Sequence, residues 1–411
     1  MKDESLNKNP HLGFLNNIEW MNAQASEIFI SVNDRNHPEL PVLSASQEWG
    51  MIYRDEGGMN IFHDVANEIT YKRVRPGQFV IHLRSFQGGF AHSKVEGITS
   101  PAYTILDFKD KNKHNDLFWK YVLTSDEFIK RLELITYGIR DGRSINFSDF
   151  STLKFQFPSY EVQQKIGSLL SHVDSLIQAK TKKLESLKAV KKSLLQKCFP
   201  KAGEKVPEMR FAGFSGDWEK VDIGTYYEFK NGLNKEKEFF GCGTPIVNYT
   251  DVYHNRGIKS NEIKGTVMLS KEELNSFSVH KGDMFFTRTS ETIDEIGYPC
   301  VMLDEPQNTV FSGFLLRCRA KKDDPLENIF KKYVFFTDAF RQEMMKKSSI
   351  TTRALTSGTS IKKMFFSYPS KEEQIQIGLF FSKYDVLISA QQKEIDKLKD
   401  IKKSLLQKMF I

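Results

Sequence analysis

The chain has 411 residues, of which 40% are hydrophobic and 12% aromatic, and its 59 Lys and Arg outnumber its 52 Asp and Glu to give a formal net charge of +7. This length and composition exclude a disordered chain and allow two or three domains with cores of their own. No apolar run approaches the ~18 residues of a membrane helix, the amino terminus is polar, and the scattered cysteines (Cys198, Cys242, Cys300 and Cys318) lack CxxC spacing, so a reduced cytoplasmic protein without a secretory signal is expected.

Residues 1–158 are predicted to form the first globular domain. Runs of β-branched and aromatic residues bounded by Pro, Asn and Gly predict short strands in this segment. A helix is predicted over 115–135, with Asn115 or Asp116 as its N-cap and apolar residues three and four positions apart. A domain of mixed strands and helices is therefore expected.

A long helix is predicted over 159–199, because apolar residues recur there in alternating steps of four and three, as in the seam of a coiled coil. The residues expected to pair are Leu170, Val173, Ile177, Leu184, Leu187 and Leu194. About 39 helical residues span roughly 58 Å, which is more than a small domain needs for its own core. The helix is therefore interpreted as a strut.

The segment 200–216 is predicted to be a linker, since Pro200, Pro207 and three Gly cannot continue the helix. A second domain is predicted over 217–369, where the order of strands and helices returns. Framework residues recur in the two domains, and the aromatic ones expected in the cores are Trp20 and Trp218, and Tyr121 and Tyr333.

Residues 370–411 are predicted to form a second long helix that copies the first. Residues 372–410 align with 161–199 without a gap at a shift of 372 − 161 = 211, and 20 of the 39 positions are identical. The residues expected to pair are Phe381, Tyr384, Ile388, Ile395, Leu398 and Leu405. Both seams are interrupted at the same two positions, by Lys180 and Lys191 and by Gln391 and Lys402. We expect the helices to pair with each other in a register set by these interruptions; an intermolecular coiled coil that only dimerises the protein is the alternative.

The basic excess is concentrated in the first of these helices. Residues 161–199 carry eight Lys against three acidic residues, whereas 372–410 carry seven Lys against six. A basic strut suits a polyanion such as DNA, although lysines on a solvated helix face explain the pattern equally well.

Four segments and the duplicated layout together resemble a known family. The segments are PEMRFAGFSGDWE at 207–219, KGDMFFTR at 281–288, FSYPSKEEQIQI at 366–377 and KKSLLQKMF at 402–410. They are similar to the DNA-sequence specificity subunit of type I restriction-modification enzymes, and the likeness covers nearly the whole chain. It is weaker before about Leu40, where the Pro-x-x-Arg-Phe lead-in is reduced to HLGFLNNIEW.

This resemblance implies an α+β fold in which two mixed α/β target recognition domains are separated by two long helices that pair as an antiparallel coiled coil, with a pseudo-twofold internal repeat. It implies that each domain reads one half of a bipartite double-stranded DNA target and that the helices set the unread gap. The implied partners are two methyltransferase subunits and, in the full complex, ATP-driven restriction subunits. S-adenosylmethionine and ATP with Mg are expected in those partners, with no cofactor, metal or catalysis in this chain.

The sequence agrees with a non-catalytic subunit because it lacks the common catalytic fingerprints. It has no glycine-rich nucleotide fingerprint with the needed flanks, Walker motif, HExxH or Asn/Asp-Pro-Pro-aromatic tetrapeptide for amino methylation. Asp251 followed by Glu262-Ile263-Lys264 superficially resembles a nuclease set, but such matches arise easily in a chain with this many charged residues.

Polar and planar side chains in the loops that differ between the domains are the candidates for DNA contact. Arg, Gln and Asn can bond bidentately to purine edges, and aromatic side chains can wedge or stack. The candidates are Gln47, Arg84, Ser85, Gln87, Arg140 and Arg143 in the first domain and Asn248, Tyr249, Arg288, Thr289, Ser290 and Arg353 in the second. Half to two-thirds of protein–DNA hydrogen bonds reach phosphate or sugar, so some of these side chains are expected to contact the backbone or only water.

Two other functions fit parts of the sequence. A protein-binding scaffold dimerised through its coiled coils predicts no binding to duplex DNA and an even-numbered assembly. A single-chain restriction enzyme that lacks its other half is disfavoured, since no residues follow the second helix. The specificity subunit is the expected function.

Overall fold

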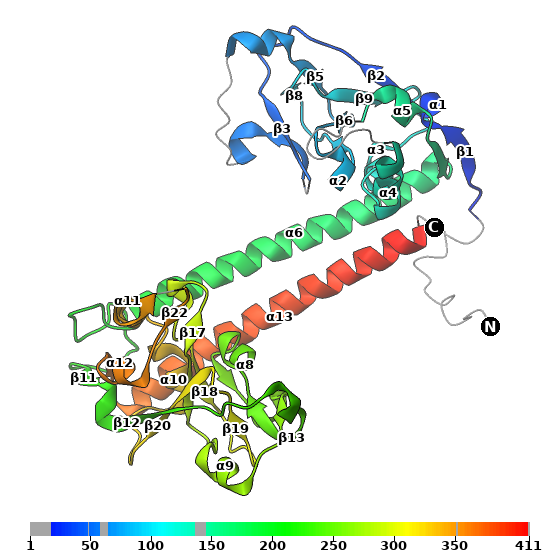
Figure 1. The fold of residues 1–411 in the computed structure, drawn as a ribbon. Helices are drawn as coiled ribbons and strands as arrows, with labels where there is room; N and C mark the ends of the chain where they lie inside the picture. Colours follow the sequence, from blue (N-terminus) through cyan, green and yellow to red (C-terminus); the bar gives the residue numbers. More distant parts are fainter. Residues whose placement is uncertain (1–17, 48, 58–64, 136–144, 351, 410–411) are drawn as a thin grey trace. The chain divides into compact units, whose positions relative to one another are not determined.

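A computed structural model describes residues 18–47, 49–57, 65–135, 145–350 and 352–409 (Figure 1). The chain divides into two compact units, Met1–Thr181 with Glu394–Ile411, and Lys182–Lys393. Each unit contains one globular domain and part of each long helix, α6 (Tyr160–Lys197) and α13 (Lys371–Met409). The predicted class, α+β with two mixed domains and two long helices, is confirmed.

The first domain is built on a four-stranded antiparallel sheet. Its strand order is β2 (Phe29–Val32), β9 (Thr104–Phe108), β6 (Phe79–Ile81) and β7 (Ala91–His92). Three two-stranded pairs accompany it: β1 (Met21–Gln24) with β10 (Lys154–Phe157), β3 (Leu43–Ser46) with β4 (Gly50–Tyr53), and β5 (Lys72–Val74) with β8 (Gly97–Thr99). The helices are α1 (Ala25–Ile28), α2 (Ser85–Gly88), α3 (Asp116–Val122), α4 (Asp126–Ile135) and α5 (Phe147–Ser151). Aromatic rings fill the core, where Phe29 and Trp119 lie 5.2 Å apart between ring centroids.

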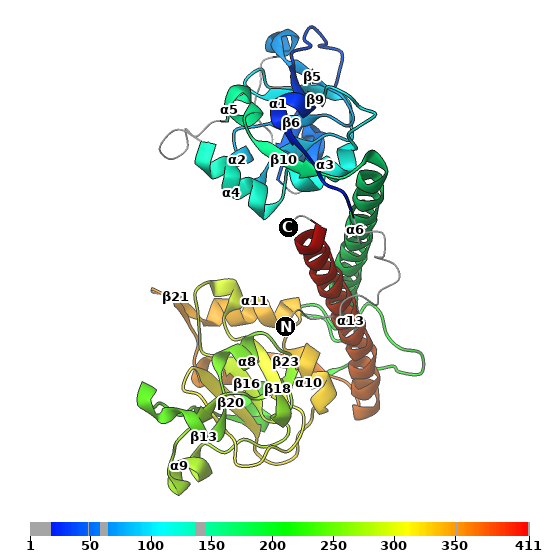
Figure 2. The same ribbon diagram turned by 90° about the vertical axis from the view of Figure 1, so that its right-hand side faces the viewer.

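The second domain has a larger sheet, of five strands. Their order is β12 (Tyr227–Asn231), β20 (Leu315–Ala320), β16 (Met284–Thr287), β18 (Pro299–Met302) and β14 (Gly257–Ile258). Three smaller sheets accompany it. The first contains β15 (Thr266–Val267), β13 (Phe240–Val247) and β19 (Val310–Phe311), and the second contains β17 (Thr289–Ser290), β22 (Ala354–Leu355) and β21 (Ser349–Ile350). The third pairs β11 (Glu219–Asp222) with β23 (Phe365–Tyr368). The helices are α7 (Ile223–Tyr226), α8 (Tyr249–Tyr253), α9 (Lys271–Ser276), α10 (Asn328–Val334), α11 (Asp338–Lys347) and α12 (Gly358–Lys362). Helices α10 and α11 lie beside the five-stranded sheet (Figure 2), with the rings of Phe286 on β16 and Phe340 on α11 in contact.

The single helix predicted over 115–135 is wrong, because the structure has two helices, α3 and α4, in its place. Asn115 is the N-cap of α3, as predicted. The break occurs because Ser125 Oγ accepts a hydrogen bond from the Phe128 amide at 3.2 Å and so starts a new helix. The second domain has the same break, where Thr337 caps α11.

One glutamine attaches each domain to the start of the long helix that follows it. Gln163 Nε2 donates to the carbonyl oxygens of Pro158 at 2.8 Å and Lys113 at 3.0 Å. Its Oε1 accepts from the Asn115 amide at 2.9 Å. Gln374, 211 positions later, bonds in the same way to two carbonyls and one amide of the second domain. The repeat in sequence is therefore also a repeat in how the domains are attached.

The two long helices pair with each other in antiparallel orientation. In the first unit, Lys402 Nζ lies 2.6 Å from Asp174 Oδ1. Also in this unit, Lys180 Nζ lies 2.5 Å from Glu394 Oε2. Residue numbers therefore rise along one helix as they fall along the other.

The second unit has the same arrangement, with Lys191 bonded to Asp385. Three of the four seam interruptions thus have a carboxylate partner, while Gln391 is buried and its Nε2 has no hydrogen-bond partner within the described residues. All twelve predicted pairing residues are buried or half-buried, whereas Leu176 and Leu387, outside the seam, are exposed.

The framework tyrosines are buried in both domains, whereas the two framework tryptophans differ. Tyr121, Tyr333 and Trp218 are buried, as predicted, and Trp218 packs against Phe199 at the end of α6, 5.7 Å between ring centroids. The prediction that Trp20 is a core residue is wrong, since it is 37% exposed. Phe199, which follows α6, covers Trp218, whereas Trp20 directly precedes β1, whose side chains are mostly exposed.

Candidate nucleic-acid interface

Four candidates of the second domain gather where the buried strand β16 ends. Arg288 follows β16, and Thr289 and Ser290 form β17. Strand β17 pairs with β22, which begins directly after Arg353. The Arg353 guanidinium lies 3.0 Å from the Glu291 carboxylate. The structure therefore brings these four residues to one edge of the domain.

Asn248 and Tyr249 belong to the same edge through the turn between β19 and β20. The Ser312 amide donates to the Val247 carbonyl at 2.9 Å, and the Arg288 amide donates to the Phe314 carbonyl at 3.0 Å. This turn thus ties the segment before Asn248 to the segment after β16.

Tyr249 ends a stack of tyrosine rings. Its ring centroid lies 5.6 Å from that of Tyr253, which lies 5.4 Å from that of Tyr298, and both pairs are nearly parallel. The hydrogen bond from Tyr253 Oη to Glu295 at 2.7 Å holds the stack and raises the pKa of Tyr253 to about 12. The result is a supported, half-exposed aromatic ring at the edge.

Both candidate serines support the backbone. Ser290 is buried, and its Oγ accepts from the Thr292 amide at 3.3 Å. In the first domain Ser85 is fully buried, and its Oγ accepts from the His82 amide at 2.8 Å. In this structure the two hydroxyls hold turns and are not presented at the surface.

The first domain has a smaller candidate edge. Gln47 and Gln87 are exposed and 3.4 Å apart, Nε2 to Oε1, and Arg84 is exposed at the start of α2. The Arg84 amide donates to His82 Nδ1 at 3.2 Å. Burial lowers the pKa of His82 to about 4, so this nitrogen is free to accept near neutral pH. The candidates Arg140 and Arg143 lie outside the described residues.

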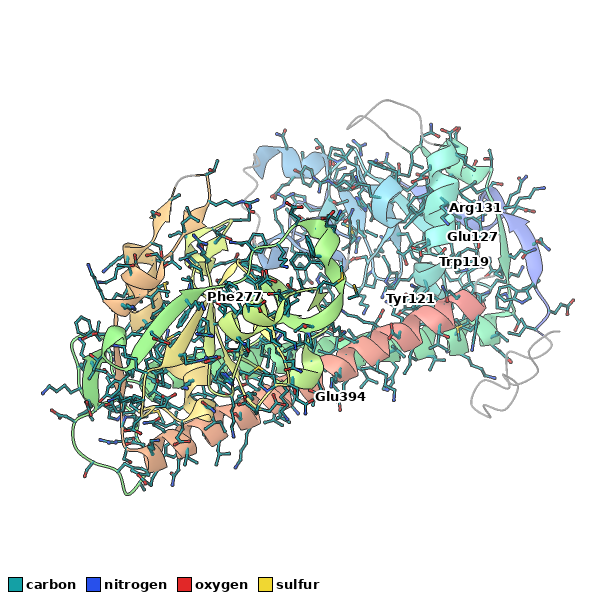
Figure 3. All side chains as sticks on the ribbon, turned by 60° about the horizontal axis from the view of Figure 1, so that its bottom comes forward. Trp119, Tyr121, Glu127, Arg131, Phe277 and Glu394 are labelled. Carbon is teal, nitrogen blue, oxygen red and sulfur yellow. The ribbon has the colours of Figure 1, made fainter. Side chains whose placement is uncertain are left out.

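Each domain is also joined to the helix pair by one aspartate, which sequence reasoning missed. Asp174 Oδ2 accepts from Tyr121 Oη at 2.7 Å and from Lys120 Nζ at 3.2 Å, and its Oδ1 bonds Lys402. Tyr121, labelled in Figure 3, lies on α3 next to α13, with Lys402 Nζ 5.6 Å from its ring centroid. The signal available in the sequence was the retention of Asp174 as Asp385 in the second repeat.

The junction recurs in the second unit. Asp385 Oδ2 accepts from Tyr333 Oη at 2.6 Å and lies 3.5 Å from Lys332 Nζ, and Oδ1 bonds Lys191. Burial alone would raise the pKa of Asp385, but the hydrogen bonds from Lys191 and Tyr333 outweigh it and hold the pKa below its usual value. The same balance holds the pKa of Asp174 low, through Lys402 and Tyr121. Both aspartates are therefore charged at neutral pH.

The weaker likeness of the amino-terminal lead-in has a structural counterpart. Arg210, in the second lead-in, forms a bidentate pair with the buried Glu373, at 2.8 Å from Nε and 2.7 Å from Nη2. In the first half of the sequence the corresponding residues are Gly13, in PHLGF, and Val162. Both members of the ion pair differ together, so no buried carboxylate is left without its arginine.

The nuclease-like residues serve as helix caps. Asp251 accepts from the Asn248 amide and Glu262 from the Lys259 amide, each three residues upstream, at 2.8 and 2.7 Å. No group of three or more His, Cys, Asp or Glu residues within the described ranges could hold a metal ion. No helix in the same ranges is long and apolar enough to cross a membrane.

The family model and two relatives that match this chain come from type I restriction systems. The type I restriction modification DNA specificity domain matches residues 19–189. The chain is 21% identical over 320 residues to the type I restriction enzyme MjaVIII specificity subunit of Methanocaldococcus jannaschii, covering 74% of this chain and 71% of that protein. It is 27% identical over 191 residues to the EcoKI specificity subunit of Escherichia coli, covering 44% of this chain and 40% of that protein.

The fold is also similar to a solved structure. The crystal structure of the type I restriction-modification S subunit from M. genitalium has a TM-score of 0.58 and 14% sequence identity, covering 96% of this chain and 97% of that one. At this sequence identity the likeness concerns the fold alone. By the domain match over residues 19–189 and by its relatives, the chain is similar to the DNA specificity subunits of type I restriction-modification enzymes.

Proposed function

We propose that the chain is the DNA-recognition subunit of a type I restriction-modification complex and that each domain reads one half of a bipartite target. One observation carries this proposal: the two units share their attachments but differ at their candidate edges. Gln163 and Gln374, and Asp174 and Asp385, make matching bonds. The loops beyond them have different lengths and side chains. Two domains that are attached in the same way but carry different surface side chains suit a protein that reads two different half-sites.

The helix pair is proposed to set the gap between the half-sites. The 38 residues of α6 rise about 57 Å, at about 1.5 Å per residue. Duplex DNA of that length holds about 17 base pairs at about 3.4 Å each, and each domain covers part of it. Half-site centres about one helical turn apart would let both domains meet one face of the duplex.

Catalysis is assigned to partner proteins. We propose that two methyltransferase subunits bind this chain and methylate adenines with S-adenosylmethionine, and that restriction subunits add ATP- and Mg-dependent cleavage. Because the net charge of +7 is small for a protein whose affinity would come largely from neutralised phosphates, the isolated chain should bind duplex weakly. The methyltransferase subunits would then supply the remaining contacts that hold the duplex.

The test is to co-express the chain with its cognate methyltransferase subunit and to map methylated adenines across a genome by single-molecule sequencing. The expected result is a split motif of two short halves with a fixed gap. Absence of methylation, with the two chains failing to co-purify, would instead favour a protein-binding scaffold.

A further inference from the structure

Bulky apolar side chains are exposed at both candidate edges, and in the second domain they include Ile350 and Leu355 in the sheet of β17. Leu83 is 62% exposed in the turn between β6 and α2, and Phe314 is 63% exposed in the turn between β19 and β20. Singly exposed apolar residues are ordinary on protein surfaces. These two differ from the ordinary case because both stand next to a candidate arginine and both turns are held rigidly.

The turn that carries Phe314 is fixed on several sides. The Gly313 amide donates to the Leu233 carbonyl at 2.8 Å, and the Leu315 amide donates to the Ser312 carbonyl at 2.9 Å. A Cβ on Gly232 would lie 2.1 Å from the Ser312 carbonyl oxygen, so the neighbouring chain crosses here only as glycine. Because these contacts hold the backbone of the turn, it has little freedom to move the exposed phenyl ring toward the protein interior.

The turn that carries Leu83 is fixed by side chains. Ser85 Oγ accepts from the His82 amide, and the Ser85 amide donates to the His82 carbonyl at 3.0 Å. The Arg84 amide is bonded to the His82 ring. Leu83 lies between the residues that these bonds join, and its side chain is exposed.

We propose that Phe314 and Leu83 are specificity-determining residues that contact bases, one in each half-site. Bulky apolar side chains recognise DNA by contact with thymine methyl groups or by wedging between base steps. Arg288, whose amide is bonded to the Phe314 carbonyl, and Arg84, the neighbour of Leu83, supply adjacent positive charge for the duplex. Because each turn is already rigid, little conformational entropy is lost when its side chain binds DNA.

This inference rests on the proposed function and is tested in the complex of the full chain with its methyltransferase subunits. The variants are Phe314→Ala and Leu83→Ala, with Phe240→Ala and Leu134→Ala as controls; Leu134 is 85% exposed on α4 and Phe240 is exposed on β13, so neither belongs to the two turns. The readout is the methylated fraction at the parental motif and at each single-base variant of both halves.

The expected result is a fall of about tenfold in methylation at the parental site for each edge variant. Relaxed sequence preference should appear in one half for Phe314→Ala and in the other half for Leu83→Ala, with neither change in the controls. Phe314→Leu, which keeps an apolar side chain, should retain most activity. If Phe314→Ala lowers the melting temperature, Phe314→Gln, which keeps bulk but is polar, takes its place and should show the same loss.

Edge variants that keep the parental motif and rate within twofold would overturn the inference while leaving the proposed function intact. Relaxation spread over both halves by a single variant would overturn it as well. If the unmodified complex methylates no split motif, the proposed function itself falls and this inference falls with it.

Discussion

The Tyr121 hydroxyl donates a 2.7 Å hydrogen bond to the Asp174 carboxylate, and Tyr333 donates to Asp385 at 2.6 Å in the second unit. Tyr121→Phe should destabilise the first unit by about 1–2 kcal/mol, because a hydrogen bond to a charged, half-buried acceptor is lost. Tyr333→Phe should do the same in the second unit. Urea unfolding measures both effects, and Tyr160→Phe, at a more exposed tyrosine, is the control. Equal stability of all three variants would mean that these bonds contribute nothing.

The same aspartates should make stability depend on pH. Their pKa values are lower in the folded state than in the unfolded chain, so their contribution is present above an unfolded pKa of about 3.9 and is lost as the pH falls through the folded value. Asp174→Asn with Asp385→Asn should cost about 1–3 kcal/mol per site at pH 7 and much less at pH 3. Unfolding at pH 7 and at pH 3 measures the free energy that the substitutions cost. The same cost at both pH values would contradict the linkage.

Lys331 forms a buried ion pair in the second domain. Its side chain is 0% exposed, and Nζ lies 2.5 Å from Asp324 Oδ2 and 2.8 Å from the Gly282 carbonyl oxygen. Lys331→Met should destabilise the domain by about 3–5 kcal/mol, because the carboxylate loses its cation. Adding Asp324→Asn should recover part of that loss. A double-mutant cycle by thermal unfolding measures the coupling between Lys331 and Asp324. Strictly additive losses of stability in the two single variants would contradict that coupling.

The cysteines should differ in reactivity. Cys242 is exposed, whereas burial raises the pKa of the Cys198, Cys300 and Cys318 thiols. Since the thiolate is the reactive form, Ellman's reagent should modify one thiol quickly in the native protein and the others only on unfolding. Cys242→Ser should remove the fast phase. A fast phase that survives this substitution would place a second thiol at the surface.

Lengthening both helices should lengthen the unread gap. Seven residues inserted after Lys182 and seven after Lys393, which correspond in the repeat, keep the seam in phase and add about 10 Å, or about three base pairs. Genome-wide methylation should then report the same two half-sites with the longer gap. Insertion into one helix alone is the control, because it mispairs the seam and should reduce methylation. A gap unchanged by the double insertion would show that the helices do not set it.

The amino-acid pattern was sufficient to predict the repeat, the two long helices, the residues on their paired faces and the Asn115 cap. These features depend on spacing within a short segment: steps of three and four place apolar side chains on one helix face. A copied segment at a constant shift keeps that spacing. The family likeness followed from the same local segments.

Contacts between distant segments were decided only by folding. Ser85 appeared in the sequence as a polar loop residue, yet in the folded domain it is fully buried. Trp20 and Trp218 match in sequence but differ in burial: Trp218 is buried against Phe199, which follows α6, whereas Trp20 is exposed. Asp174 meets Lys402 across 228 positions of the chain (402 − 174). Such contacts depend on which elements pack together, and no local spacing in the sequence encodes that packing.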